Sequence, residues 1–143
     1  MTGKVQQKWV AALQIRILLA DDYAAVRRGV RAVLESRGDW KVVAEADNGR
    51  DALARARETK PDLAVIDISM PIMNGLELTR ELRKALPDTE ILILTQHASR
   101  AMLEQALKLG ARGYVVKSVV AADLIPAVEA ALEHRMFASS CLE

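Results

Sequence analysis

The sequence predicts an α/β fold built on a five-stranded, doubly wound parallel sheet, and two observations lead to this prediction. Five short apolar runs rich in Val, Ile and Leu recur at nearly regular intervals, and each is too short for a helix. The stretches between them have the 3.6-residue period of amphipathic helices. Near-continuous apolar strands that alternate with helices are typical of a parallel sheet covered on both faces.

Each apolar run is assigned to one strand. Because crossovers between parallel strands are right-handed, few strand orders are available, and we expect the flavodoxin-like order 2-1-3-4-5. The predicted strands are Ile15–Ala20, Trp40–Ala46, Leu63–Asp67, Glu90–Leu94 and Gly113–Val116.

The helical stretches are bounded by residues that favour helix ends. Asn48 and Ser99 are suited to N-caps, and Gly110 stands where a helix should stop. Pro126 falls inside the last helical stretch. Because proline is tolerated only in the first turn of a helix, we expect this helix to begin near Asp123 or to kink.

Composition limits the class of protein. The 143 residues fit one domain, and the content of 51% hydrophobic residues argues against a disordered chain. The net charge of +1 gives no global field for nucleic acid or anionic membranes, and the single cysteine, Cys141, excludes an internal disulfide framework. No apolar run reaches the ~18 residues of a membrane span, so we expect a soluble protein of a reducing compartment. We divide the chain into an N-terminal extension (1–14), one domain (15–135) and a C-terminal tail (136–143).

Polar side chains follow four of the predicted strands. Asp21 and Asp22 follow the first strand, and Asp67 ends the third. Thr95 follows the fourth strand and Lys117 the fifth. Ligands of a doubly wound sheet bind beyond the carboxyl ends of its strands, so these side chains are predicted to converge at one rim.

The types of these side chains indicate phosphoryl chemistry with a metal ion. Three carboxylates repel one another unless a cation joins them, and hard oxygen ligands select Mg²⁺ or a related ion such as Mn²⁺. The Lys117 ammonium and the Thr95 hydroxyl are suited to bind phosphoryl oxygens. A carboxylate held among them can attack phosphorus.

Asp67 is the best candidate for that nucleophile. It ends a central strand and precedes a loop of defined shape, ISMPIMNG. In this loop Pro71 is expected to rigidify the turn, and Asn74-Gly75 to permit a positive φ before the next helix.

Four motifs occur in order along the chain: LLADD, VIDISMPIMNGLE, ILILTQHAS and GARGYVVKS. Together they resemble the receiver domain of bacterial two-component response regulators. The segments TQHAS and ARGYVVKS most resemble receivers joined to a LuxR-type helix-turn-helix domain. The resemblance covers residues 15–135 and implies that Asp67 accepts a phosphoryl group from a histidine kinase or from a small donor such as acetyl phosphate.

The resemblance also implies a metal-binding role for individual residues. Asp22 would bind Mg²⁺ directly, and Asp21 would assist through a water molecule. Asp67 and the backbone carbonyl of Ser69 would complete the protein ligands.

A switching mechanism follows from the same resemblance. Thr95 and Lys117 would hold the phosphoryl oxygens, and Tyr114 would rotate inward as Thr95 moves. The protein would be a regulatory phospho-acceptor rather than an enzyme with other substrates.

The implied partners are a sensor histidine kinase and, on phosphorylation, a second copy of the chain. DNA would be contacted only through a C-terminal helix-turn-helix domain, and residues 136–143 would be a tail or the start of the linker to it. A cytoplasmic location and no membrane partner are implied.

Other functions compete with this interpretation. An aspartate phosphatase would need a second Asp two residues after the nucleophile, where Ser69 stands. The sequence contains neither GxxxxGK[ST] nor GxGxxG, which argues against a nucleotide-binding protein. A flavin-binding protein would have no use for three carboxylates beside the anionic phosphate of its cofactor. The alternative that stays open is a phosphorylation-independent interaction module of the same fold.

Two further hypotheses concern residues around the rim. His97 and Ser69 are expected to flank the aspartyl phosphate and to tune its hydrolysis by controlling water access. Arg27, Arg28 and Arg31 are expected to form a solvated helix face, which the resemblance interprets as a kinase-docking surface.

Overall fold

The computed structural model describes residues 14–142 and has one parallel sheet of six strands in the order β2-β1-β3-β4-β5-β6. This confirms the predicted order 2-1-3-4-5 and adds a sixth strand beside β5. The predicted N-terminal extension lies outside the described residues except for Gln14. The strands are β1 (Ile15–Ala20), β2 (Trp40–Ala46), β3 (Leu63–Ile66), β4 (Glu90–Thr95), β5 (Gly113–Val116) and β6 (Phe137–Ala138).

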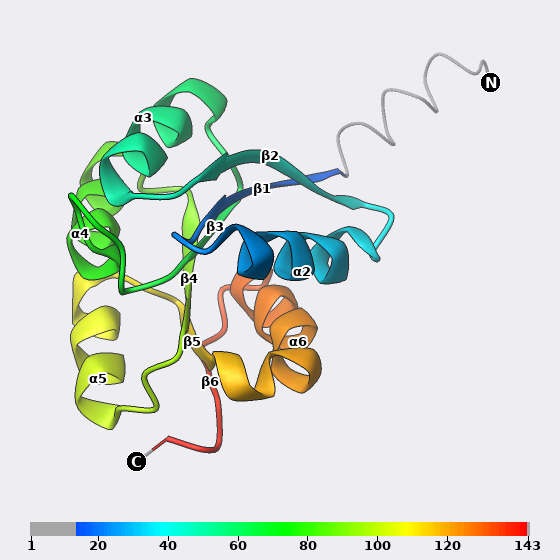
Figure 1. Cartoon of the computed structure of the whole chain (residues 1–143), viewed down its shortest axis with the longest axis vertical. Coiled ribbons are helices and arrows are strands. Elements are labelled where there is room, and N and C mark those ends of the chain that lie inside the picture. Colours follow the sequence, from blue (N-terminus) through cyan, green and yellow to red (C-terminus); the bar gives the residue numbers. More distant parts are fainter. Residues whose placement is uncertain (1–13, 143) are drawn as a thin grey trace.

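Helices cover both faces of the sheet, as the alternating pattern predicts (Figure 1). Two of them lie on one face: α2 (Ala24–Glu35) and α6 (Val120–Leu132). Three lie on the other: α3 (Gly49–Thr59), α4 (Gly75–Ala85) and α5 (Arg100–Leu109). Each face therefore has an apolar core of its own, and the strands are buried between the two.

The central strands supply side chains to both cores. In β1, Ile17 and Leu19 pack toward α2 and α6, whereas Leu18 and Ala20 pack toward α3, α4 and α5. All four of these side chains are almost completely buried. Burial of one large aliphatic side chain contributes about 1.5–3 kcal/mol, so this double-sided packing fixes the register of the strands and the position of their carboxyl ends.

The helix ends follow the predicted capping chemistry. The Asn48 side chain accepts a hydrogen bond from the Asp51 amide, and the Ser99 side chain accepts one from the Met102 amide. Asn74 forms a capping box with Glu77 at the start of α4. Gly110 ends α5 with a φ of 113°, a left-handed conformation that glycine adopts without steric cost.

The prediction of a late start for the last helix is wrong. A 3₁₀ turn over Lys117–Val119 leads directly into α6, which begins at Val120 and contains Pro126. Both Pro126 and Ala122, whose carbonyl would have paired with the missing amide, are exposed. Water can satisfy that carbonyl, so the proline is tolerated on the outer face of the helix.

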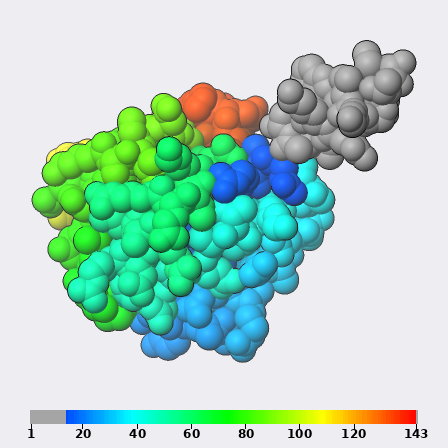
Figure 2. Space-filling view, turned by 90° about the horizontal axis from the view of Figure 1, so that it is seen from above, coloured from blue at the N-terminus to red at the C-terminus, as the bar shows by residue number. Residues whose placement is uncertain are grey.

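The two edges of the sheet differ. Figure 2 is turned toward one of them, where β2 and α3, in cyan and green-cyan, face the viewer. The other edge is formed by β6, which pairs in parallel with β5 through Phe137 and Ala138. Within residues 14–142, no helix has the length and apolar character needed to cross a membrane.

Candidate functional site

The carboxyl ends of β1 and β3 bring three aspartates together. Asp21 follows β1 directly, Asp22 comes next, and Asp67 follows β3. One carboxylate oxygen of each lies within 4.8 Å of the others. Asp21 and Asp67 are buried, whereas Asp22 is exposed at the mouth of the cluster. The predicted convergence of these carboxylates is therefore present.

Lys117 reaches the same cluster from the end of β5. Its Nζ lies 2.7 Å from Asp21 Oδ2 and 3.3 Å from Asp67 Oδ2. Burial lowers the pKa of Lys117, but the hydrogen bond to Asp21 and the charges of both aspartates outweigh it and raise the pKa. The ammonium stays charged at neutral pH, and it pairs with two of the three carboxylates, those of Asp21 and Asp67.

Asp67 has an environment in which its negative charge is poorly compensated. Burial raises the pKa of this carboxyl, and the charge of Asp21 raises it further. The charge and hydrogen bond of Lys117 and a backbone hydrogen bond from Ser69 lower it, and the net shift is upward. Its second oxygen, Oδ1, is buried and accepts no hydrogen bond of normal geometry from residues 14–142. A buried carboxylate oxygen without a partner costs free energy, so the arrangement favours a cation or an added donor at this atom.

The residues after β4 form a small hydrogen-bonded group beside Asp67. Thr95 is the last residue of β4 and is fully buried; its hydroxyl oxygen accepts a long hydrogen bond, 3.4 Å, from the His97 amide. His97 Nε2 lies 2.8 Å from Ser69 Oγ. The side chains two residues beyond Asp67 and two beyond Thr95 therefore contact each other and connect the loops on either side of the site.

Tyr114 lies behind this group and points inward. Its ring is completely buried, and its hydroxyl donates a hydrogen bond of 2.7 Å to the His97 carbonyl. Burial, together with the charge of Asp67, raises the pKa of Tyr114 to about 12, so the phenol remains a neutral donor.

The loop between β3 and α4 corrects one prediction. The residue with a positive φ is Ile72, at 72°, and not Gly75. Gly75 is required for another reason: a Cβ there would collide with the Asp67 carbonyl oxygen, while the Gly75 amide donates to the Ile68 carbonyl at 2.9 Å. Close packing of α4 against the backbone of Asp67 thus fixes the nucleophile candidate.

The contacts that orient Asp21 were not predicted. Its Oδ1 accepts a hydrogen bond from the Tyr23 amide at 2.9 Å, and its carbonyl accepts one from the Arg27 guanidinium at 2.5 Å. Asp side chains often accept a hydrogen bond from the backbone amide two residues later. This pattern could have predicted the bond from the Tyr23 amide to Asp21.

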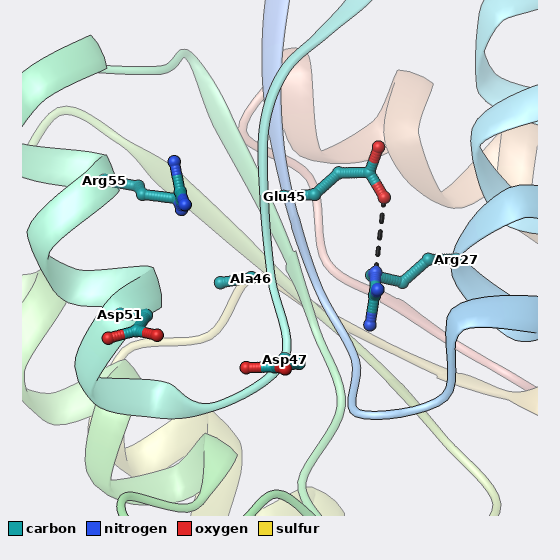
Figure 3. Close-up of a pocket in the computed structure, with 6 residues that line it drawn as sticks. All are labelled: Arg27, Glu45, Ala46, Asp47, Asp51 and Arg55. Atoms are coloured by element: carbon teal, nitrogen blue, oxygen red, sulfur yellow. Dashed lines mark hydrogen bonds and ion pairs between the residues drawn. The ribbon is translucent and has the colours of Figure 1, made fainter.

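The predicted arginine face is only partly solvated. Arg27 and Arg31 both form ion pairs with Glu45, and Arg28 is the exposed member. Figure 3 shows the Arg27–Glu45 pair beside a pocket at the β2 edge that Arg55 also lines. Asp21, Asp22 and Asp67 do not line this pocket, so it is separate from the carboxylate cluster.

The donor set of the cluster fits a hard divalent cation. Three carboxylate oxygens within 4.8 Å of one another, one of them from a residue with a buried unpartnered oxygen, match the oxygen ligands that Mg²⁺ prefers. The ligand role of the Ser69 carbonyl stays a prediction.

Comparison with known proteins agrees with this geometry. Residues 17–129 match the family described as the response regulator receiver domain. The chain is 39% identical over 118 residues to a transcriptional regulatory protein of Bacillus subtilis, YxjL, a match that covers 82% of this chain and 54% of YxjL. It thus spans about half the length of the curated relatives it matches.

Solved structures give the same result. A LuxR-family two-component response regulator from Aurantimonas has a TM-score of 0.85 and 41% identity, over 89% of this chain and 91% of that one. The isolated receiver domain of RcsB from Salmonella enterica, in the presence of the phosphomimetic BeF₃⁻, has a TM-score of 0.83 and 26% identity, over 91% of this chain and 99% of that one. The chain belongs to the response regulator receiver domain family.

Proposed function

We propose that this chain is a phosphorylation-dependent signalling switch in which Asp67 is the phospho-acceptor. The observation that carries the proposal is the charge imbalance at the carboxyl end of the sheet. Among the described residues, the Lys117 ammonium is the side-chain cation paired with the three clustered carboxylates, and it reaches only Asp21 and Asp67, while Asp67 Oδ1 is buried without a partner. A site that binds a cation and a phosphoryl group would satisfy both features.

The chemistry requires one bond to form and one to break. A carboxylate oxygen of Asp67 bonds to phosphorus, and the bond from phosphorus to the imidazole nitrogen of a phosphohistidine, or to the acyl oxygen of acetyl phosphate, breaks. The leaving group takes the electron pair. Such transfer depends on positioning and on charge stabilisation more than on acid or base catalysis.

Each polar side chain has a role in this transfer. Asp22, Asp21 and Asp67 would hold Mg²⁺, which supplies positive charge to offset the phosphoryl oxygens. Lys117 exchanges its contact with Asp67 Oδ2, now 3.3 Å, for a phosphoryl oxygen. Thr95, at the end of the strand next to β3, donates its hydroxyl to another oxygen.

The switch would act through the loop after β4. When Thr95 turns to the phosphoryl group, its contact with the His97 amide changes, and His97 is also bonded to Tyr114. A shift of these residues alters the surface that would control dimerisation or a DNA-binding output domain. A sensor histidine kinase is the expected donor, because the chain belongs to the family of its acceptors.

The experiment is intact-mass measurement after incubation with acetyl phosphate, with and without Mg²⁺. We expect the wild-type chain to gain one phosphoryl group only with Mg²⁺, and the Asp67→Asn variant to gain none. Asp62→Asn, at an exposed aspartate outside the cluster, is the matched control and should react like wild type. Equal gain by Asp67→Asn would refute the assignment; no gain by wild type from acetyl phosphate or a phosphohistidine donor would favour a phosphorylation-independent interaction module.

A further inference from the structure

The sixth strand is attached to the residues that the proposed switch uses. β6 pairs with β5 in the register Gly113↔Phe137 and Tyr114↔Ala138. The Ser139 amide then donates to the Tyr114 carbonyl at 3.0 Å. Tyr114 is thus bonded at its hydroxyl to the His97 loop and at its backbone to the C-terminal strand.

Ser139 closes the outer edge of β5 with its side chain. Its hydroxyl accepts a hydrogen bond from the Val116 amide at 3.1 Å and donates one to Asp123 Oδ2 at 2.8 Å. Ser139 is almost completely buried, although the next residue, Ser140, is exposed. Val116 immediately precedes Lys117, so this bond holds the end of β5 from which the site lysine extends.

The position of β6 also restricts the Tyr114 ring. Paired residues of neighbouring strands point to the same face, and Tyr114 and Ala138 both contribute to the core beneath α3, α4 and α5. β6 therefore places Ala138 beside Tyr114 on the face where the buried ring packs. The docked strand favours the inward position of the ring.

The attachment of β6 is weaker than that of the other strands. It consists of two residues, both only partly buried, whereas β4 pairs with β5 through four. Short elements with few buried contacts open locally at low free-energy cost. Its docking can therefore respond to a small change in Tyr114 or Val116.

We propose that Phe137–Ser139 is a clamp that holds Tyr114 inward, and that its docking is favoured by phosphorylation of Asp67. This inference rests on the proposed function. A phosphoryl group that fixes Thr95 also orders the His97 carbonyl to which Tyr114 is bonded, and an ordered Tyr114 lowers the entropy cost of docking β6. Because coupling is reciprocal, loss of the clamp must weaken binding of a phosphoryl group or its mimic.

The test measures hydrogen exchange of the Val116 and Ser139 amides with Mg²⁺, with and without beryllofluoride as phosphoryl mimic. We expect beryllofluoride to slow exchange at both amides by at least about fivefold, the lower end of typical coupling. Ser139→Ala should weaken beryllofluoride binding by a similar factor, and Ser139→Thr, which retains the hydroxyl, should restore it. Ser140→Ala, at an exposed neighbour, is the matched control and should behave like wild type.

Phosphorylation is read separately, by intact mass of the same protein with acetyl phosphate. If Asp67 is phosphorylated and the two amides exchange equally fast or faster with beryllofluoride, the clamp is refuted and the proposed function stands. Unchanged beryllofluoride binding by Ser139→Ala also refutes it. If neither phosphorylation nor beryllofluoride binding occurs, the proposed function fails and the clamp fails with it.

Discussion

Each end of the sheet holds a buried acidic side chain, but the carboxylate oxygens are fully paired at one end and incompletely paired at the other. At the amino end, both oxygens of Glu90 are paired: Arg112 lies 3.2 Å from Oε1, and His134 Nδ1 lies 2.7 Å from Oε2. At the carboxyl end, Asp67 shares one lysine with Asp21 and leaves Oδ1 unpartnered among residues 14–142.

The pKa directions record this difference. Burial raises the pKa of Glu90, but hydrogen bonds from Arg112 and His134 outweigh it and lower the pKa below 4.5. Burial raises the pKa of Asp67, and Lys117 does not fully offset it, so the pKa stays above 3.8. The pairing of Glu90 is typical of a structural buried acid, whereas the incomplete pairing of Asp67 is typical of a binding-site acid.

The largest expected effect is on the rate of phosphorylation, and it distinguishes Lys117 at the carboxyl end from Arg112 at the amino end. Lys117→Ala should slow phosphoryl incorporation from acetyl phosphate by about a hundredfold, since it removes a charge aimed at the developing phosphoryl charge. Arg112→Ala at the amino end should leave the rate unchanged while the protein remains folded. Initial rates by intact mass, with circular dichroism to check folding, compare the two; equal rates for both variants would remove Lys117 from the site.

The next prediction concerns stability and has opposite signs at the two ends. In a chelator at pH 7, Glu90→Gln should lower the free energy of unfolding by about 1–2 kcal/mol, a value reduced because the partners are partly exposed. Asp67→Asn should raise it by about 1 kcal/mol, because it removes repulsion with Asp21. Urea denaturation measures both, and a loss of stability in Asp67→Asn would contradict the charge imbalance.

The same pair gives a pH dependence. Because the pKa of Glu90 is lowered in the folded state, its contribution is complete above pH 4.5 and is lost as the pH falls through the folded value. Asp67 has a raised pKa, so its contribution favours folding below pH 3.8 and is lost as the pH rises through the folded value. Wild type should therefore lose more stability than Glu90→Gln between pH 4.5 and pH 3.

A smaller effect is expected from the two histidines. His97→Ala removes the contact with Ser69 Oγ and opens the mouth of the site, so the half-life of the phosphorylated protein should fall by about threefold as water gains access. His134→Ala, at the other end, is the control and should leave the half-life unchanged. An unchanged half-life in His97→Ala would remove this histidine from the control of hydrolysis.

The smallest effect concerns the strained loop at the carboxyl end. Ile72 is 65% exposed and has a φ of 72°, which is unfavourable for a β-branched residue. Ile72→Gly should raise the free energy of unfolding by about 0.5–1 kcal/mol, since relief of strain outweighs the added freedom of the unfolded chain. Pro71→Gly, which adds freedom without relieving a positive φ, is the contrasting variant and should destabilise; destabilisation by both would deny strain at Ile72.

The fold and the cluster were readable from the sequence for one physical reason. Buried parallel strands are continuous apolar runs, so the polar residue that ends each run, such as Asp21, Asp67 or Lys117, is visible in the sequence. Because the sheet is parallel, all these ends meet at one rim, and the convergence follows without knowledge of side-chain positions.

The features that the sequence did not predict depend on local geometry and on exposure to solvent. The start of α6 was missed because the penalty of Pro126 depends on which helix face is exposed. β6 has only two residues, Phe137 and Ala138, and this stretch is too short to show a strand periodicity in the sequence. The positive φ at Ile72 contradicts residue preference, so the sequence could not indicate it; in the same loop the carbonyls of Ile68 and Met73 accept hydrogen bonds from the Gly75 and Gly49 amides.

We expect Asp67, and neither Asp21 nor Asp22, to accept the phosphoryl group. Borohydride reduces an aspartyl phosphate to homoserine, which peptide mapping can locate. After reaction with acetyl phosphate and Mg²⁺, we expect homoserine at position 67 and aspartate at positions 21 and 22. Homoserine at position 21 or 22, with aspartate at 67, would refute Asp67 as the phospho-acceptor.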